Sequence, residues 1–163
     1  MGHSFDEAFA AEFAPLHRYI ARRVGAAAAD ELAAETFTVA FRRWERLDPE
    51  RPVRPWLYGI AANLMRHHWR KERRMLRAYA RTGVDPVFAE DHEPAEDTRE
   101  LAAALAQLRR DEREILLLHA WAELTDTEIA AALGIPAGTV KSRLSRTREK
   151  LRNRLDPGGI EAV

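Results

Sequence analysis

TDTEIAAALGIPAGTVKSRLSRTREKL, residues 125–151, is the stretch that decides the fold of the second half of this chain. Thr125 followed by Glu128 has the spacing of a capping box, which marks the start of a helix. Gly134 can adopt a positive φ and end that helix. A longer helix is predicted to begin around residues 136–138. A short capped helix, a glycine turn and a longer helix make a helix-turn-helix.

The longer helix of this motif has two different faces. At 100° per residue, Val140, Leu144 and Leu151 share one face, which suits a core. The opposite face carries hydroxyl and cationic side chains. A helix in the major groove contacts base edges with such residues, and arginine can bind guanine through two hydrogen bonds. A solvated basic helix is the plainer alternative. The candidate DNA-binding residues of this helix are Thr139, Lys141, Ser142, Arg143, Ser145 and Arg146.

Further helices are expected on both sides of an acidic segment that precedes the motif. Asp111 has capping-box spacing to Glu114 and predicts the start of the helix directly before the motif. Between residues 83 and 94, glycine, prolines and repeated acids replace the apolar periodicity, which is typical of a flexible linker. A separate helical domain is therefore predicted before this segment.

The N-terminal half also shows helical periodicity. Ser4 and Glu7 have capping-box spacing, and apolar residues then recur every three or four positions. Proline inside a helix removes a hydrogen bond, so two segments are expected to meet near Pro15. Gly25 is expected to close the second segment, and Asp30 to cap the next helix.

A further helix of this half is expected to begin near Pro55, because proline suits the first turn. Residues 66–81 follow as a block of basic side chains in which Glu72 is the one acid. A second basic block covers residues 141–154, and an acidic stretch lies between the two blocks. Equal numbers of basic and acidic side chains, 26 each, conceal this separation of charge.

Composition excludes several classes of protein. The chain has 0 cysteines, so disulfides and cysteine-ligated zinc are excluded. No apolar run approaches the roughly 18 residues that span a bilayer, and the N-terminus lacks an export signal. We therefore expect a cytoplasmic protein without membrane insertion. The fold expected is all-α, with two small helical domains joined by a flexible acidic linker: residues 1–80, linker 81–96, helix-turn-helix domain 97–156 and tail 157–163.

The run EIAAALGIPAGTVKSRLSRTREKL, residues 128–151, resembles region four of extracytoplasmic-function sigma factors in the sigma-70 family. The resemblance implies that the second helix recognises the minus-thirty-five promoter element. The family's contacts fall on Lys141, Ser142, Ser145 and Arg146, with Thr139 and Arg143 adjacent.

The run ADELAAETFTVAFRRW, residues 29–44, resembles region two of the same family, whose helix docks on the clamp of RNA polymerase. Two glutamates one turn apart would offer paired carboxylates to a basic partner. The family usually has glutamine where this chain has Ala34. By resemblance, the polymerase-binding candidates are Glu31, Leu32, Glu35 and Phe37.

The run PWLYGIAANLMRHHWRKERR, residues 55–74, resembles the family's promoter-opening segment, which captures the minus-ten element as a single strand. Unstacked bases need aromatic faces beside cationic side chains. The loop 47–54 corresponds to a pocket for an everted base. Gly59 stands where the family commonly has a basic or larger residue. The candidate DNA-binding residues of this segment are Trp56, Tyr58, Asn63, Arg66, Trp69, Arg70 and Lys71.

The prediction is a sigma factor that binds core RNA polymerase and promoter DNA and is monomeric when free. The family also implies an anti-sigma factor as partner. An ordinary DNA-binding regulator is the first alternative, but it leaves the region-two resemblance unexplained. A nucleic-acid enzyme is the second, yet no spacing for a phosphate loop, a helical zinc pair or a nucleophile elbow is present. We therefore expect no catalytic residues, no cofactor and no metal site.

Overall fold

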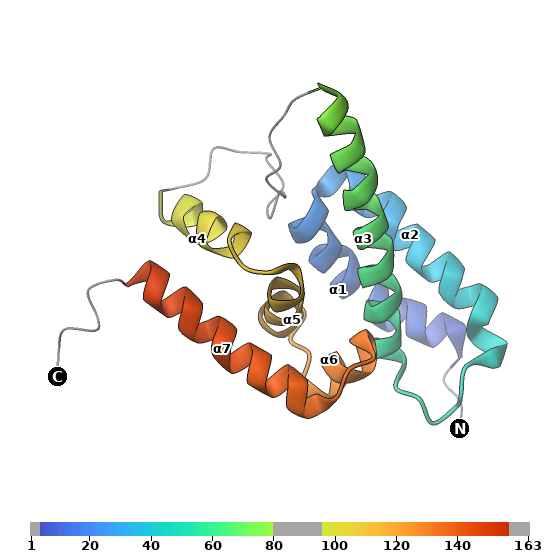
Figure 1. Ribbon diagram of the computed structural model, residues 1–163. Coiled ribbons are helices and arrows are strands. Elements are labelled where there is room, and N and C mark those ends of the chain that lie inside the picture. The colour runs from blue at the N-terminus through green and yellow to red at the C-terminus, as the bar shows by residue number, and fades with distance from the viewer. Residues whose placement is uncertain (1–3, 80–95, 157–163) are drawn as a thin grey trace.

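A computed structural model describes residues 4–79 and 96–156 of the chain, and these residues form helices and connecting loops without a strand (Figure 1). The all-α fold with two helical domains is confirmed, while the segment predicted as the linker falls almost entirely outside the described residues. The elements are α1 (Phe5–Val24), α2 (Ala26–Arg43), the 3-10 helix η1 (Trp44–Arg46), α3 (Val53–Tyr79), α4 (Glu96–Ala106), α5 (Arg110–Ala120), α6 (Asp126–Leu133) and α7 (Ala137–Leu155). None of the described helices combines the length and hydrophobicity needed to cross a membrane.

The first helix, α1, is continuous through Pro15, so the prediction of two segments is wrong. Its start is as predicted: the Ser4 hydroxyl accepts a 3.1 Å hydrogen bond from the Glu7 amide, and the Glu7 carboxylate accepts one from Ser4. Leu16 and Ile20, both fully buried, follow the proline and pack in the core with α2 and α3. Burial of this apolar face compensates for the hydrogen bond that proline removes.

Helix α2 begins earlier than predicted, directly after Gly25, whose φ of 96° ends α1. Asp30 therefore lies inside α2 and does not cap it. Its carboxylate is 2.6 Å from Nε2 of His17 and joins α2 to α1. A glycine with positive φ lets two helices follow each other without a loop. The prediction of a cap at Asp30 did not allow for such a joint.

Helix α5 also begins two residues earlier than predicted, with Arg109 rather than Asp111 at the N-cap and Glu112 rather than Glu114 reaching back to it. The Glu112 carboxylate accepts a 3.1 Å hydrogen bond from the amide of Arg109. Glu114 is instead paired with an arginine of the first domain, and Asp111 with Arg143 of α7. Competing tertiary partners thus override the local capping pattern.

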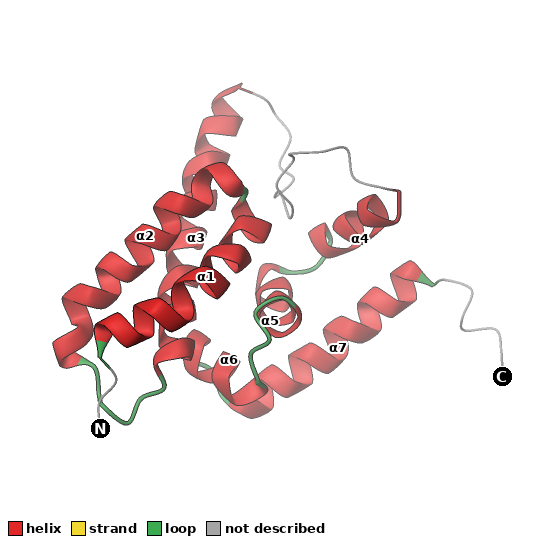
Figure 2. Ribbon diagram, turned by 180° about the vertical axis from the view of Figure 1, so that it is seen from behind, coloured by secondary structure: helices red, strands yellow, loops and turns green. Residues whose placement is uncertain are grey.

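The two domains lie against each other. Helix α6 packs on the first half of α3, and both views of the chain show the two side by side (Figures 1 and 2). The approach is very close at one point: a Cβ atom added to Gly59 of α3 would lie 2.5 Å from the carbonyl oxygen of Ala132 in α6. The absence of a side chain at Gly59 therefore permits this contact.

Candidate nucleic-acid interface

The helix-turn-helix has the local structure that its residues predicted. Thr125 caps α6, accepting a 3.2 Å hydrogen bond from the amide of Glu128, whose carboxylate accepts one from Thr125. Gly134 ends α6 in the left-handed conformation, with φ 66° and ψ 37°. Ile129 of α6 is fully buried between the helices of this domain. The start of α7 at Ala137 is thereby fixed relative to α6.

The recognition helix α7 separates a buried face from an exposed one. Val140, Leu144 and Thr147 are all at most 3% exposed and hold α7 on the domain. The exposed face is about 180° away around the helix and carries no acidic side chain in its first two turns. Four of the candidate DNA-binding residues are exposed there: Lys141, Ser142, Ser145 and Arg146.

The remaining two candidates on α7 are less available. Thr139 is partly buried, and its carbonyl accepts a 3.2 Å hydrogen bond from the Ser142 hydroxyl. Arg143 is also partly buried, with its guanidinium 3.3 Å from the carboxylate of Asp111. Arg143 must release Asp111 before it can bind DNA, because its fork of donors is partly occupied.

Charged hydrogen bonds hold α7 and α4 on α5. The Glu112 carboxylate binds the ammonium group of Lys150 in α7. The Arg113 guanidinium donates to the carbonyls of Leu105 and Leu108 at 3.0 and 3.1 Å, and so closes the end of α4. Burial acts to raise the pKa of Glu112, but the hydrogen bonds from Lys150 and Arg109 outweigh it and lower the pKa.

The exposed polar candidates of the first domain lie along the middle of α3. Asn63, Arg70 and Lys71 are exposed. Arg66 is partly buried, and its guanidinium donates a 3.2 Å hydrogen bond to the Asn63 side chain. This stretch offers cations and an amide to a nucleic-acid backbone or base edge.

The aromatic candidates of the first domain are largely buried. Tyr58 is 1% exposed, its ring is 5.5 Å from that of Tyr19, and burial raises its pKa. Trp56 is 9% exposed and contacts Trp44 at 6.0 Å between ring centroids. Trp69 is partly buried beneath a guanidinium of α1. The role of these three residues with DNA stays a prediction.

A cavity of about 340 Å³ lies beside Trp56 and the loop that follows η1. Its cationic lining was only partly foreseen, because the resemblance pointed to residues 47–54 and two of the arginines precede that loop. The signal for these two arginines, Arg43 and Arg46, was their spacing of three residues, because residues three apart on a helical segment are neighbours on its surface. The lining residues are Arg43, Arg46, Leu47, Asp48, Arg51 and Trp56.

The candidate polymerase-binding residues divide into two pairs. Glu31 and Glu35 are exposed one turn apart on α2. Leu32 and Phe37 are 6% and 4% exposed and belong to the core of the first domain. The carboxylates can therefore reach a partner directly, whereas the two apolar residues fix the position of α2.

A buried ion pair across the two domains was not predicted. Arg23 of α1, 3% exposed, donates two 3.2 Å hydrogen bonds to the carboxylate of Glu114 in α5. It also donates a 2.8 Å hydrogen bond to the Tyr19 hydroxyl, and its guanidinium lies 4.7 Å from the ring centroid of Trp69. We call Arg23, Tyr19 and Glu114 the interdomain cluster. Burial acts to lower the pKa of Arg23, but the neighbouring Tyr19 and Glu114 outweigh it, so the arginine stays charged.

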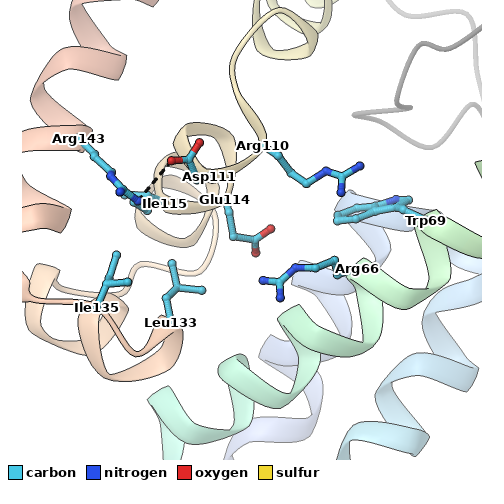
Figure 3. A pocket seen from close by; sticks show the side chains of 9 residues that line it. All are labelled: Arg66, Trp69, Arg110, Asp111, Glu114, Ile115, Leu133, Ile135 and Arg143. Atoms are coloured by element: carbon cyan, nitrogen blue, oxygen red, sulfur yellow. Dashed lines mark ion pairs between the residues drawn. The ribbon is translucent and has the colours of Figure 1, made fainter.

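A second cavity, of about 380 Å³, opens next to this cluster between α3 and the second domain (Figure 3). In the close view Arg66 and Trp69 face it from α3, with Glu114 between them and the helix-turn-helix. Candidate DNA-binding residues of both domains thus line one space. The lining residues are Arg66, Trp69, Arg110, Asp111, Glu114, Ile115, Leu133, Ile135 and Arg143.

The adjacent histidines of α3 do not form a metal site. Residues next to each other in a helix point to different faces. His68 is 3.3 Å from the carboxylate of Glu72, and His67 is exposed. Within residues 4–79 and 96–156, no three histidine, aspartate or glutamate side chains gather in a way that could hold a metal ion.

Each of the two domains matches a known protein family. Residues 9–75 match the model of sigma-70 region 2, and residues 98–151 match that of sigma-70 region 4. CarQ, an RNA polymerase sigma factor of Myxococcus xanthus, is 34% identical over 164 residues, which cover 98% of this chain and 94% of CarQ. The extracytoplasmic-function sigma factor EcfG of Rhodopseudomonas palustris is 34% identical over 137 residues, 82% of this chain and 74% of EcfG.

Solved structures agree with this assignment. CnrH, in complex with the cytosolic domain of CnrY, is 26% identical with a TM-score of 0.64, covering 94% of this chain and 88% of that one. The sigma factor RpoE from Bartonella quintana, in complex with the anti-sigma factor NepR, shares the fold at 22% identity, with a TM-score of 0.68 and coverage of 94% and 98%. The chain therefore belongs to the sigma-70 family of RNA polymerase sigma factors, and its relatives are of the extracytoplasmic-function type.

Proposed function

We propose that this sigma factor binds core RNA polymerase through α2, reads the upstream promoter element through α7 and holds the opened strand along α3. The observation that carries the proposal is the exposed face of α7. Lys141, Ser142, Ser145 and Arg146 stand there on a helix that Gly134 and the buried inner face hold in place. A rigid helix with donors on its first three turns meets the geometric need of major-groove recognition.

The polar side chains along α7 have different roles in this proposal. Arg146 is suited to a guanine, whose N7 and O6 accept both branches of a guanidinium. Lys141 and the two serines are suited to bases or phosphates. The later cations Arg152 and Arg154 are exposed on the last turns of α7, where phosphate contact is expected. The first three turns therefore supply specificity and the last turns supply affinity.

The opened strand is assigned to the first domain. Asn63, Arg70 and Lys71 are exposed on α3 and can hold the strand through its phosphates and base edges. The cavity beside Trp56 supplies an aromatic wall and three guanidinium groups. A base turned out of the stack needs such a wall and nearby donors. Tyr58 is assigned to the core of the domain, because a ring 1% exposed offers no face to a base.

Docking on polymerase is assigned to the carboxylates of Glu31 and Glu35. Exposed side chains on the same helix face can meet a basic surface without rearrangement of α2. Leu32 and Phe37 contribute indirectly, by fixing α2 against the other helices of the domain.

Partners and location follow from this assignment. RpoE of Bartonella quintana was solved with an anti-sigma factor, and we infer an anti-sigma partner for this chain as well. Action on core polymerase and chromosomal promoters implies the cytoplasm. The protein contributes binding energy to promoter melting and is not itself an enzyme.

The proposal is tested by mixing the purified protein with bacterial core polymerase and separating the complexes by size-exclusion chromatography. We expect the protein to elute with polymerase, and the complex to retain promoter fragments that free protein does not retain. A protein that binds duplex DNA but never elutes with polymerase would support the ordinary-regulator alternative instead.

A further inference from the structure

The guanidinium of Arg148 in α7 is held by a residue outside its own helix. Its Nη2 lies 2.7 Å from Nε2 of His119, in the last turn of α5. A guanidinium has hydrogen-bond donors and no acceptor. Nε2 therefore accepts this hydrogen bond, and the imidazole is the neutral form with its proton on Nδ1.

The second ring nitrogen of His119, Nδ1, does not account for the orientation of the ring. It is buried and has no hydrogen-bond partner in the part of the chain that the structure describes. A buried N–H group without a partner costs free energy, so this nitrogen does not favour the observed orientation. The hydrogen bond between Nε2 and Arg148 is the polar interaction that does.

Arg148 differs from two other cations of α7 in the charge of its partner. Arg143 and Lys150 are paired with carboxylates of α5, those of Asp111 and Glu112. A carboxylate that holds a cation also offsets its positive charge. A neutral imidazole restrains the guanidinium and leaves that charge in place. Arg148 is therefore fixed in position and still able to attract an anion.

Acidic side chains near Arg148 compete with His119 for its guanidinium. A cavity of about 500 Å³ beside α7 is lined by both residues, and also by Asp126 of α6 and Glu149 of α7. An arginine without a fixed partner has many rotamers and would be attracted to either carboxylate. The hydrogen bond to His119 limits this exchange. The other lining residues are Lys141, Leu144, Ser145 and Arg152.

Arg148 belongs to a row of cations on one flank of α7. At about 100° per residue, Lys141, Arg148 and Arg152 lie within about 40° of one another, and all three are exposed. The row borders the face that carries Ser142 and Ser145. In a helix-turn-helix on DNA, the first helix crosses the phosphate backbone while the second lies in the major groove. The cavity between the start of α6 and this row is therefore placed to receive a phosphate.

We propose that His119 is a positioning residue for DNA binding, which holds the Arg148 guanidinium, with its charge intact, where a phosphate of the promoter duplex binds. The phosphate contact rests on the proposed function of α7, whereas the hydrogen bond between the two side chains does not. Immobilising a long side chain during binding costs affinity, and a side chain that is already held avoids this cost. Because phosphates carry no sequence information, the effect is on affinity for all duplexes.

Three substitutions separate positioning from a structural role. Arg148→Met removes the guanidinium and keeps an apolar side chain. His119→Leu removes the acceptor, and His119→Gln supplies an amide oxygen as a replacement acceptor. His67→Leu is the matched control, because it makes the same change at an exposed histidine of α3.

Binding of the full chain to a short mixed-sequence DNA duplex is measured by fluorescence anisotropy over a series of salt concentrations. We expect Arg148→Met to weaken binding about five- to tenfold at about 0.1 M salt and to lower the salt dependence by about one ion. His119→Leu should weaken binding about two- to tenfold, but should have no further effect when combined with Arg148→Met. His119→Gln should restore most of the lost affinity, and His67→Leu should bind as the parent does.

The melting temperature should be the same in all variants, because the buried side chains of Leu144 and Thr147 hold α7 on the domain without His119. Equal weakening by His119→Leu with and without Arg148 would overturn the proposal, since His119 would then act on the domain as a whole. The same holds if His119→Gln binds no better than His119→Leu. A parent that does not bind the duplex, or an unchanged salt dependence in Arg148→Met, would refute the phosphate contact.

The hydrogen bond itself is tested without DNA or polymerase, by nitrogen NMR of the isotope-labelled full chain at neutral pH. The His119 signals are identified by their loss in His119→Gln. We expect a proton on Nδ1 and an unprotonated Nε2, whose signal shifts in Arg148→Met. A proton on Nε2 would overturn the proposal, because that nitrogen could not accept from Arg148. This result can be positive while the proposed function fails, so the two failures are distinguishable.

Discussion

Arg146 is the residue whose role in sequence reading is most specific. Its side chain is exposed, and in the free protein its Nε donates a 3.4 Å hydrogen bond to the Ser142 carbonyl. We expect Arg146→Ala to lose about 1 to 3 kcal/mol of binding free energy at one base position, the range for a two-hydrogen-bond base contact. Binding of the polymerase complex to promoters varied base by base measures this loss.

Arg152→Ala is the matched control for this prediction. Arg152 is exposed on the same helix but lies nearly two turns further on. A phosphate contact there should weaken all sequences equally and reduce the salt dependence of binding by about one ion. Equal weakening of all promoters by Arg146→Ala would show that Arg146 does not read a base.

The proposed docking on core RNA polymerase depends on Glu35. Glu35→Lys reverses the charge of an exposed side chain, so we expect failed polymerase binding with an unchanged melting temperature. Co-elution with core polymerase measures the effect. Glu45→Lys makes the same change elsewhere on the surface of the first domain and should leave polymerase binding intact. Normal binding by Glu35→Lys would remove Glu35 from the interface.

The turn between α6 and α7 is the element that sets the angle of the recognition helix. Gly134 has φ 66°, and no atom lies within 4 Å of an added Cβ, so a substitution there meets backbone strain alone. We expect Gly134→Ala to lower the free energy of unfolding by about 1 to 2 kcal/mol. Urea denaturation measures it. Gly138→Ala, in the first turn of α7 with equally open surroundings, should not destabilise.

The attachment of α7 to α5 should depend on pH. The Glu112 pKa is lowered in the folded protein, so its contribution is present above the ordinary carboxyl pKa of about 4.3 and is lost as pH falls through the lowered value. We expect Glu112→Gln to be less stable than the parent by about 1 to 3 kcal/mol at pH 7. The difference should shrink at an acidic pH below that lowered value. A deficit that is the same at both pH values would contradict a role for the charge.

Element starts and ends were predictable where the determining atoms are close in sequence. The capping boxes at Ser4 and Thr125 and the left-handed Gly134 each involve residues within one helical turn. The predictions at Pro15 and Asp30 were wrong, because neither position is decided by a pattern within one helical turn. Burial of α1, and a glycine joint between two helices, decide those positions, and neither is a local pattern.

At the scale of the whole molecule, the sequence predicted two helical domains but not their contact. No local sequence pattern predicts the ion pair between Arg23 and Glu114, because the two residues are 91 positions apart. Gly59 did carry one, as a glycine where the family commonly has a larger residue. Its reason became clear only from the distance to Ala132.

Packing within the first domain explains why some candidate residues are hidden. Tyr58 and Trp56 were predicted as aromatic platforms from the resemblance of residues 55–74 to the promoter-opening segment, but a sequence pattern cannot separate a core ring from an exposed one. Both lie on the buried side of α3, where Tyr58 meets Tyr19 and Trp56 meets Trp44. Exposure, and not residue type, therefore decides which members of the segment can meet DNA.

Run-off transcription by purified core polymerase, with and without this protein, tests the central claim most directly. A library of promoter fragments serves as template, because the promoter is not known in advance. The account predicts specific transcripts that appear only when the protein is added and that disappear with Glu35→Lys. Transcripts that are identical with and without the protein, from a preparation that still binds duplex DNA, would contradict it.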